Sequence, residues 1–306
     1  TPVLGKKIMT TINDSTVVTS TALFSLAILN SDGFSISKQE LVSRIELLKS
    51  LLEEDKYSSK TLICEKTGEE IIDQMKNLGF LSKEDINDRI SLTNLEAAKL
   101  SFYRNNISHL LIFESLICGF FQYQKEINKE DLFQSIKMIY PFLKEEFFLK
   151  WDEANLDELI NLKLNKLINK NLILEDSSIF KRPDFKSKEF YEMQSLGKLV
   201  QPSIDRFYVL ISQLWKNSIE HISKNELERN SLEILKNLEK TQARLTPEFS
   251  EKWMFDIFLS RLIENKYVRE DDKGMLYPTR ITHRLEKDAN KFLEPHWLKE
   301  LSKSTP

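Results

Sequence analysis

Glycine and proline are scarce in this sequence, with seven glycines and eight prolines among 306 residues. Because these residues form most tight turns, their scarcity favours long helices over a turn-rich sheet protein. Seven isolated glycines cannot form a glycine-rich phosphate loop, and the chain contains no G-x-S-x-G nucleophile elbow. The sequence therefore lacks the signatures of a phosphate-loop enzyme and of a serine hydrolase.

Residues that bind metals are few and scattered. The sequence has four histidines and two cysteines, and Cys64 and Cys118 are 54 residues apart. No Cys or His stands at ligand spacing from another, so a zinc site finds no support. We expect reduced thiols, no metal and no other cofactor.

An excess of one charge and a long hydrophobic run are also missing. The 44 basic and 47 acidic residues are interleaved, whereas a phosphate-backbone binder usually has a basic excess. The longest apolar run, Ile107–Phe121, is interrupted by His109 and Glu114. It is shorter than the roughly 20 residues that span a bilayer. We predict a buried core helix there, in a soluble chain whose start at Thr1 is typical of an excised fragment.

A short pattern occurs three times. The strings ISKQEL from Ile36, INKEDL from Ile127 and ISKNEL from Ile222 share the form I-[SN]-K-x-[ED]-L, and their starts lie 91 and 95 residues apart. Ser or Asn ahead of an acidic and then an apolar residue predicts a helix N-cap with negative charge in the first turn.

The surroundings of each copy repeat as well. Apolar helices are predicted ahead of the copies, over Val17–Leu29, Ile107–Tyr123 and Ile204–Ile219. A long charged helix and an amphipathic helix follow each copy. Hairpin signals then begin 44, 45 and 45 residues after the isoleucine, at Phe80, Leu172 and Tyr267.

Helix, helix, helix and hairpin is the order of a winged-helix unit. We therefore predict a mainly α fold of three tandem winged-helix-like repeats with short β-hairpins, packed as one helical region. The units cover residues 1–95, 96–190 and 191–306, the last with a C-terminal helix. Charge and the helix-breaking Pro183 mark the second boundary.

Winged helices most often bind DNA through the third helix, which then carries exposed basic and amide side chains. The third helices here instead contain several acidic residues: Asp73, Asp157, Glu158, Asp256 and Glu264. This composition disfavours nucleic acid and favours a protein–protein scaffold. A stand-alone winged-helix module that binds nucleic acid or protein remains the alternative function.

The string HRLEKD, from His283 to Asp288, matches H-x-x-x-x-D. In acyltransferases that motif pairs a histidine base with an orienting aspartate. In a helix, residues five apart point about 140° away from each other, and no glycines or arginines nearby would hold a phosphorylated substrate. His109–Glu114 and His221–Glu226 show that similar spacings arise by chance. We therefore assign no catalytic residue.

Two polar and aromatic blocks stand out. YRNNISHL, Tyr103–Leu110, precedes the most apolar predicted helix, and YPFLKEEFFLKWDEANLD, Tyr140–Asp157, mixes aromatic and charged residues. Either block fits a capped helix start with its core residues. Either also fits a docking surface, since arginine and aromatic residues are enriched at interfaces.

These blocks resemble the Y-R-N-N-x-x-H and Y-P-x-L-K-x-E-F-x-x-x-W-D segments of the bacterial membrane-associated glycerol-3-phosphate 1-O-acyltransferases. Three more segments are similar to landmarks of that family, in the same order: KKIMTTINDSTVV near the start, QPSIDRFY (Gln201–Tyr208) and PEF (Pro247–Phe249). The resemblance covers nearly the whole chain and is weakest at its end. It implies the C-terminal region of such an enzyme.

The resemblance also implies a function and a partner. The family transfers an acyl group from acyl-CoA or acyl-carrier protein to glycerol-3-phosphate in phospholipid synthesis, at the cytoplasmic face of the bacterial inner membrane. Its catalytic residues belong to an upstream acyltransferase domain, so this chain alone should be inactive. The region should act as a scaffold or regulator that packs on that domain, with membrane association through the parent enzyme. We predict this docking surface: Arg104, Asn105, His109, Lys144, Glu145, Trp151 and Asp152.

Overall fold

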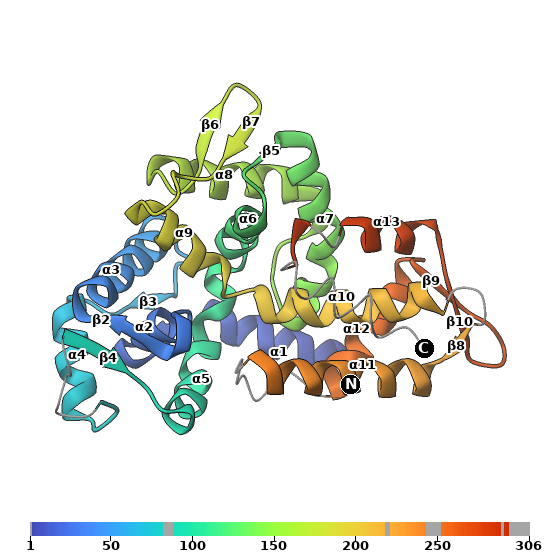
Figure 1. The fold of residues 1–306 in the computed structure, drawn as a ribbon, viewed down its shortest axis with the longest axis horizontal. Helices are drawn as coiled ribbons and strands as arrows, with labels where there is room; N and C mark the ends of the chain where they lie inside the picture. The colour runs from blue at the N-terminus through green and yellow to red at the C-terminus, as the bar shows by residue number, and fades with distance from the viewer. Residues whose placement is uncertain (1, 82–87, 218–220, 243–251, 289–290, 294–306) are drawn as a thin grey trace.

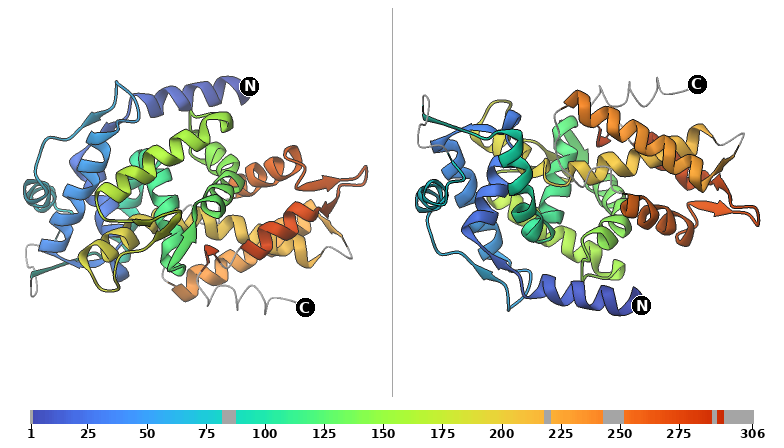
Figure 2. Two further views of the ribbon diagram at one scale, coloured as in Figure 1. Left: turned by 90° about the horizontal axis from the view of Figure 1, so that it is seen from above. Right: turned by 90° about the horizontal axis from the view of Figure 1, so that it is seen from below.

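Helices form most of the structure, as the scarcity of glycine and proline predicts. The computed structural model describes residues 2–81, 88–217, 221–242, 252–288 and 291–293. Helix α1 lies at the lower centre of Figure 1, the elements from α2 to α5 on the left, those around residues 110–180 at the top, and those after 200 on the right. Figure 2 gives two further views.

The elements follow one another in three groups. The first comprises α1 (Pro2–Asp14), β1 (Val17–Val18), α2 (Ser20–Leu29), β2 (Ser35–Ser37), α3 (Lys38–Glu54), β3 (Leu62–Ile63), α4 (Gly68–Asn77) and β4 (Arg89–Ser91). The second comprises α5 (Asn94–Ser108), α6 (Ile112–Tyr123), β5 (Glu126–Asn128), α7 (Lys129–Glu146), α8 (Leu156–Asn169), β6 (Leu174–Asp176) and β7 (Ile179–Lys181). The third comprises α9 (Lys188–Gly197), α10 (Gln201–Lys216), β8 (Ile222–Ser223), α11 (Lys224–Gln242), α12 (Lys252–Glu264), β9 (Val268–Glu270), β10 (Met275–Pro278) and α13 (Arg280–Asp288).

The three signature strings form the predicted N-caps. The Ser37 hydroxyl accepts a hydrogen bond from the Glu40 amide at 3.2 Å, and the Asn128 side chain accepts one from the Asp131 amide at 2.8 Å. In the third copy, the Ser223 hydroxyl accepts from the Glu226 amide at 3.3 Å. Each cap satisfies an amide that the first helical turn leaves without an intrahelical acceptor.

Each signature isoleucine lies in a short strand with an apolar partner in an antiparallel strand. The pairs are Ile36 with Ile90, Ile127 with Phe180, and Ile222 with Leu276. The later two copies have complete hairpins, β6–β7 and β9–β10. The turn of the first predicted hairpin falls on residues 82–87, outside the described residues.

The most apolar segment forms the predicted core helix. Every residue of α6 from Ile112 to Phe121 is buried, and the helix packs closely on α9 and α8. Among the helices within the described ranges, none is long and apolar enough to cross a membrane.

Three predicted helix boundaries were wrong. The helix expected over Val17–Leu29 begins at Ser20, because Thr19 caps it and Val17 lies in β1. The helix expected from Ile107 begins at Ile112, after α5 and a short 3-10 turn. The helix expected from Ile204 begins at Gln201, with a proline in its first turn.

Candidate functional site

The block Tyr140–Asp157 forms the last turns of α7, a loop that folds back on them, and the start of α8. The Tyr140 hydroxyl donates to the Trp151 carbonyl at 2.7 Å, and the Leu149 amide donates to the Lys144 carbonyl at 3.0 Å. Lys144 also forms an ion pair with Asp152 at 2.9 Å. These contacts hold residues 147–152 against the end of α7, and we call this region the α7 junction.

Aromatic rings join the α7 junction to the first group of elements. The Trp151 ring meets the Tyr57 ring edge-on at 4.8 Å and the Phe113 ring at 5.4 Å. Tyr57 in turn meets the His109 ring at 5.2 Å, and the Lys150 amide donates to the Tyr57 hydroxyl at 3.2 Å. Burial raises the pKa of Tyr57 to about 12, so this ring stays neutral at physiological pH.

Helix α1 is seated on the junction by polar contacts. The Lys6 ammonium contacts the Glu145 carboxylate at 2.5 Å, and the Asn13 amide donates to the Phe147 and Phe148 carbonyls at 2.8 and 3.2 Å. Just beyond the helix, the Thr16 hydroxyl lies 3.2 Å from Nε2 of His109. Helix α1 and Thr16 thus contact residues that lie more than 90 positions away in the sequence.

Two adjacent glutamates connect the junction to the third group. Glu145 also pairs with Arg261 of α12, while Glu146 accepts from Ser203 at 2.7 Å and from Arg206, both on α10. Burial raises the pKa of Glu146, and the Arg206 charge opposes that rise. The C-terminal end of α7 therefore contacts α1, α10 and α12.

The structure brings five of the seven predicted docking residues to this junction: His109, Lys144, Glu145, Trp151 and Asp152. Arg104 and Asn105 lie in the last turns of α5, where the Arg104 guanidinium donates to the Asn105 side chain at 3.0 Å. They do not form a helix start, which was one interpretation of their block.

His109 requires a correction. Its side chain is only 5% exposed, because Tyr57 and the end of α1 cover the ring. It therefore lies inside the junction and not on its surface. Burial lowers its pKa to about 4, so the imidazole is neutral at pH 7. The docking role of the other six residues stays a prediction.

Sequence reasoning missed the partners that complete the junction: Lys6, Asn13, Thr16, Tyr57, Ser203, Arg206 and Arg261. Lys6, Asn13 and Thr16 lie in the first family-like segment, and Ser203 and Arg206 in QPSIDRFY. The resemblance had marked these segments, but no local spacing indicated that they meet.

A second buried charge cluster joins α6 to α8. Glu114 is 1% exposed and accepts from Lys166 at 2.9 Å, with Lys163 3.1 Å away. Lys163 also pairs with Asp55 at 2.6 Å. Burial opposes ionisation of Glu114, but the Lys163 and Lys166 charges outweigh it and hold its pKa below the usual value.

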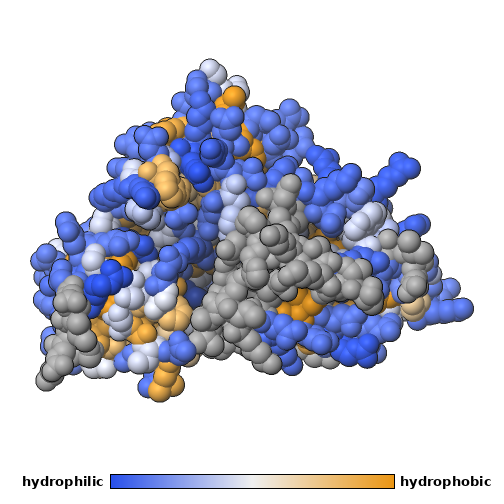
Figure 3. Space-filling view, viewed as in Figure 1, coloured by the Kyte–Doolittle hydropathy of each residue, from blue (hydrophilic) through white to orange (hydrophobic). Residues whose placement is uncertain are grey.

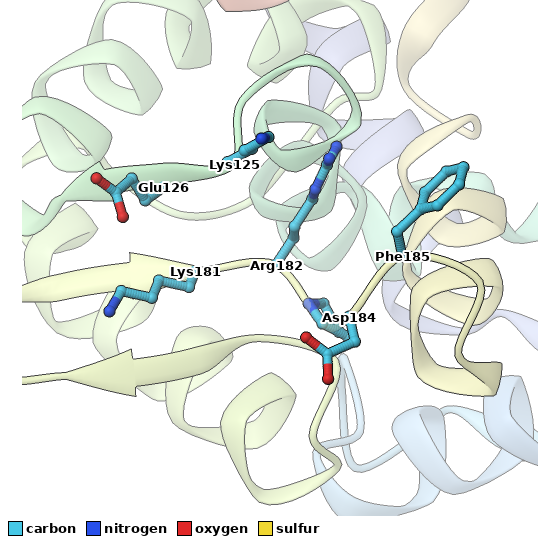
Figure 4. Close-up of a pocket in the computed structure, with 7 residues that line it drawn as sticks. Lys125, Glu126, Lys181, Arg182, Asp184 and Phe185 are labelled. Carbon is cyan, nitrogen blue, oxygen red and sulfur yellow. The ribbon is translucent and has the colours of Figure 1, made fainter.

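A hollow of the surface lies away from the junction. It is open, has a volume of about 580 Å³, and lies between the start of β5 and the loop after β7. Figure 4 shows Lys125 and Arg182 pointing to the same side of this hollow, with Phe185 beside it and Lys181 turned away. This mixture provides no nucleophile with an adjacent base.

The H-x-x-x-x-D string does not form a histidine–aspartate pair. The His283 ring stacks on Trp215 at 4.1 Å, and Asp288 pairs with Lys291 at 2.9 Å. Both residues therefore have partners of their own. Within the described residues, no group of three or more His, Cys, Asp or Glu side chains is placed to hold a metal ion.

The chain matches one family model, described as the glycerol-3-phosphate acyltransferase C-terminal region, over residues 1–271. A Pseudomonas fluorescens (strain Pf0-1) protein named glycerol-3-phosphate acyltransferase is 26% identical over 95% of this chain and 35% of its own length. A Xanthomonas campestris pv. campestris protein of the same name is 29% identical over 89% of this chain and 32% of its own length.

The chain thus spans about a third of the length of these curated relatives. The matched family model covers most of the chain, including the α7 junction and the segments that meet there. The chain belongs to the glycerol-3-phosphate acyltransferase C-terminal region family.

Proposed function

We propose that the whole protein is a glycerol-3-phosphate 1-O-acyltransferase and that this chain is its scaffold or regulatory region. The parent enzyme would transfer an acyl group from acyl-CoA or acyl-carrier protein to glycerol-3-phosphate, at the cytoplasmic face of the bacterial inner membrane. The family membership and the names of the relatives support this proposal. The chain alone would not transfer acyl groups.

One observation carries the scaffold role: the family-like segments hold helices together. Glu145 and Glu146 of α7 bind Lys6 of α1 and Arg206 of α10, and His109 contacts Thr16, just beyond α1. Polar side chains committed to such contacts fix the relative positions of helices. The chemistry would then belong to the acyltransferase region of the parent.

The architecture would consist of three winged-helix-like units, over residues 1–95, 96–190 and 191–306. The support is the repeated order of a signature strand, a capped helix and an antiparallel partner strand. Packing of the units on one another at the α7 junction would make them a single body.

The third helices argue against the nucleic-acid alternative. On α8, Lys163 and Lys166 are buried beside Glu114. Just past the end of this helix, Lys170 pairs with Glu54. On α12, Arg261 pairs with Glu145 and Glu264. Cations that are already paired with carboxylates are poorly placed to replace the counterions of a phosphate backbone.

We place the docking surface for the acyltransferase region at Arg104, Asn105, Lys144, Glu145, Trp151 and Asp152. Trp151 is a poor single test of this surface, since its ring packs on Tyr57 and Phe113 and its removal would disturb the core. Arg104 and Asn105 are a better test because they lie outside the junction.

The experiment compares Arg104→Ala, Asn105→Ala and the exposed control Glu158→Ala in the full-length protein. Each docking variant should lower acyltransferase activity about fivefold, the effect of losing ~1 kcal/mol at an interface, with an unchanged melting temperature. The control should keep full activity. Full activity in both docking variants would contradict the proposed surface.

A further inference from the structure

Helix α1 carries an apolar stripe on its outer side. Leu4, Ile8 and Ile12 are 58%, 51% and 55% exposed, and their spacing of four residues aligns them along one helix face. Just past the helix, Val17 and Leu62 face each other in the β1–β3 pair and are 53% and 61% exposed. Five large aliphatic side chains thus stay in water around one short helix.

This orientation is the reverse of that expected for an amphipathic helix on a protein surface, which turns its apolar side inward. The inner side of α1 is polar, and three contacts hold it: Lys6 with Glu145, Asn13 with the Phe147 carbonyl, and Asp14 with Lys150 at 3.6 Å. Because these contacts lie on two turns at opposite ends of the helix, α1 cannot rotate to bury Leu4 and Ile8 without losing them.

The position of α1 matches that of an interface. Both views of Figure 2 show it along one edge of the molecule, with its start pointing outward. The face drawn in Figure 3 is mostly hydrophilic, with separate small apolar areas. A stripe of aliphatic residues held outward by polar contacts is a typical sign of a partner surface.

We propose that the α1 stripe, defined as Leu4, Ile8, Ile12, Val17 and Leu62, is a second contact surface for the acyltransferase region of the parent protein, in addition to the docking residues proposed above. This inference rests on the proposed function. The matched relatives are about three times as long as the matched segment. The family model that matches α1 describes a C-terminal region, so a larger part of the parent would be available to cover the stripe.

The chemistry of α1 fits a protein better than a lipid surface. Helices that lie in a membrane interface are rich in Lys and Arg on the polar face and carry aromatic residues on the apolar one. Helix α1 contains two lysines and no aromatic residue. One of those lysines, Lys6, is already bound to Glu145.

The test is hydrogen–deuterium exchange of residues 2–14, measured on this chain and on the full-length protein. Exchange should be about tenfold slower in the full-length protein, since an interface suppresses local opening. Ile8→Glu should abolish that protection and leave the melting temperature of the shorter chain unchanged. Leu95→Glu on α5, at a site 67% exposed, is the matched control and should keep the protection.

Three results would overturn the inference. The first is equal exchange in the two proteins. The second is a dimer of the shorter chain that Ile8→Glu converts to a monomer, which would make a second copy the occupant. The third is Ile8-dependent binding of the shorter chain to phosphatidylglycerol vesicles. An acyltransferase assay of the full-length protein separates the two proposals: activity with an unprotected α1 contradicts only this inference, whereas no activity contradicts the proposed function.

Discussion

Glu145 accepts from Lys6 at 2.5 Å across 139 residues of sequence, and Arg261 reaches the same carboxylate oxygen. One side chain at the end of α7 thus ties the first helix of the chain to the third group of elements. Its side chain is 17% exposed, so solvent screens the two ion pairs only in part.

Glu145→Ala should release α1 without unfolding the rest. Loss of the pair with Lys6 should cost about 1 kcal/mol, as for a partly exposed salt bridge. Trypsin should then cleave after Lys6 or Lys7 faster than in the original chain, while the melting temperature falls by a few degrees. Glu158→Ala on α8 is the control, and equal cleavage rates in the two variants would contradict the proposed seating of α1.

Glu114 should be far more sensitive than any surface glutamate. Glu114→Gln leaves Lys163 and Lys166 with less negative charge in a buried site, which should cost roughly 3–5 kcal/mol. Urea denaturation of Glu114→Gln and Glu158→Gln provides the comparison.

The pH dependence of this site follows from its lowered pKa. The contribution of Glu114 to the free energy of unfolding is fully present above the unfolded pKa of about 4.3 and is lost as the pH falls through the lower folded pKa.

A Glu114→Gln variant as stable as the original chain would show that the cluster is not what holds α6 to α8.

His109 should make stability fall on mild acidification. Its folded pKa of about 4 lies below its usual value of 6.5, so the unfolded chain takes up a proton first as the pH drops. The contribution of neutral His109 to the free energy of unfolding is complete above pH 6.5 and is lost as the pH falls towards 4. Between pH 7 and pH 5 the free energy of unfolding should fall by about 2 kcal/mol.

Replacing this residue isolates the effect. His109→Gln should lack that part of the pH dependence, which urea midpoints at pH 7 and pH 5 measure. The free energy of unfolding of the original chain, relative to that of His109→Gln, should be about 2 kcal/mol lower at pH 5 than at pH 7. An unchanged difference would mean that His109 titrates equally in both states.

Two glycines at the α6–α9 contact should respond differently to the same substitution. An added methyl group at Gly197 would lie 2.6 Å from Nε2 of Gln122 and 3.0 Å from the Cys118 backbone, whereas at Gly119 its nearest neighbours are 3.8 Å away. Gly197→Ala should therefore cost about 1–3 kcal/mol through overpacking. Gly119→Ala should be tolerated, since helix propensity favours alanine. Thermal unfolding compares the pair, and equal melting temperatures would contradict this packing.

Features with a local origin could be predicted from the sequence. The N-caps at Ser37 and Asn128 and the burial of α6 depend on neighbouring residues, and the structure contains them. The mainly helical fold and its small antiparallel sheets followed from the same patterns, whereas the parallel β1–β3 pair did not.

Features that depend on distant residues could not be predicted. Lys163 and Lys166 look like ordinary solvated helix residues, yet they are buried because Glu114, about 50 positions away, lies between α6 and α8. His109 was predicted to lie on a surface, but the Tyr57 ring covers it. Of the candidate site, the α7 block could be identified from its residues, but its partners on α1 and α10 could not.

The proposed function is tested most directly by an acyl-transfer assay on two proteins, this 306-residue chain and the proposed full-length parent. Both are incubated with palmitoyl-CoA and glycerol-3-phosphate, and the formation of 1-acylglycerol-3-phosphate is measured. The proposed function predicts product from the full-length protein and none above background from the chain. Product from the chain alone, or from neither protein, would contradict it.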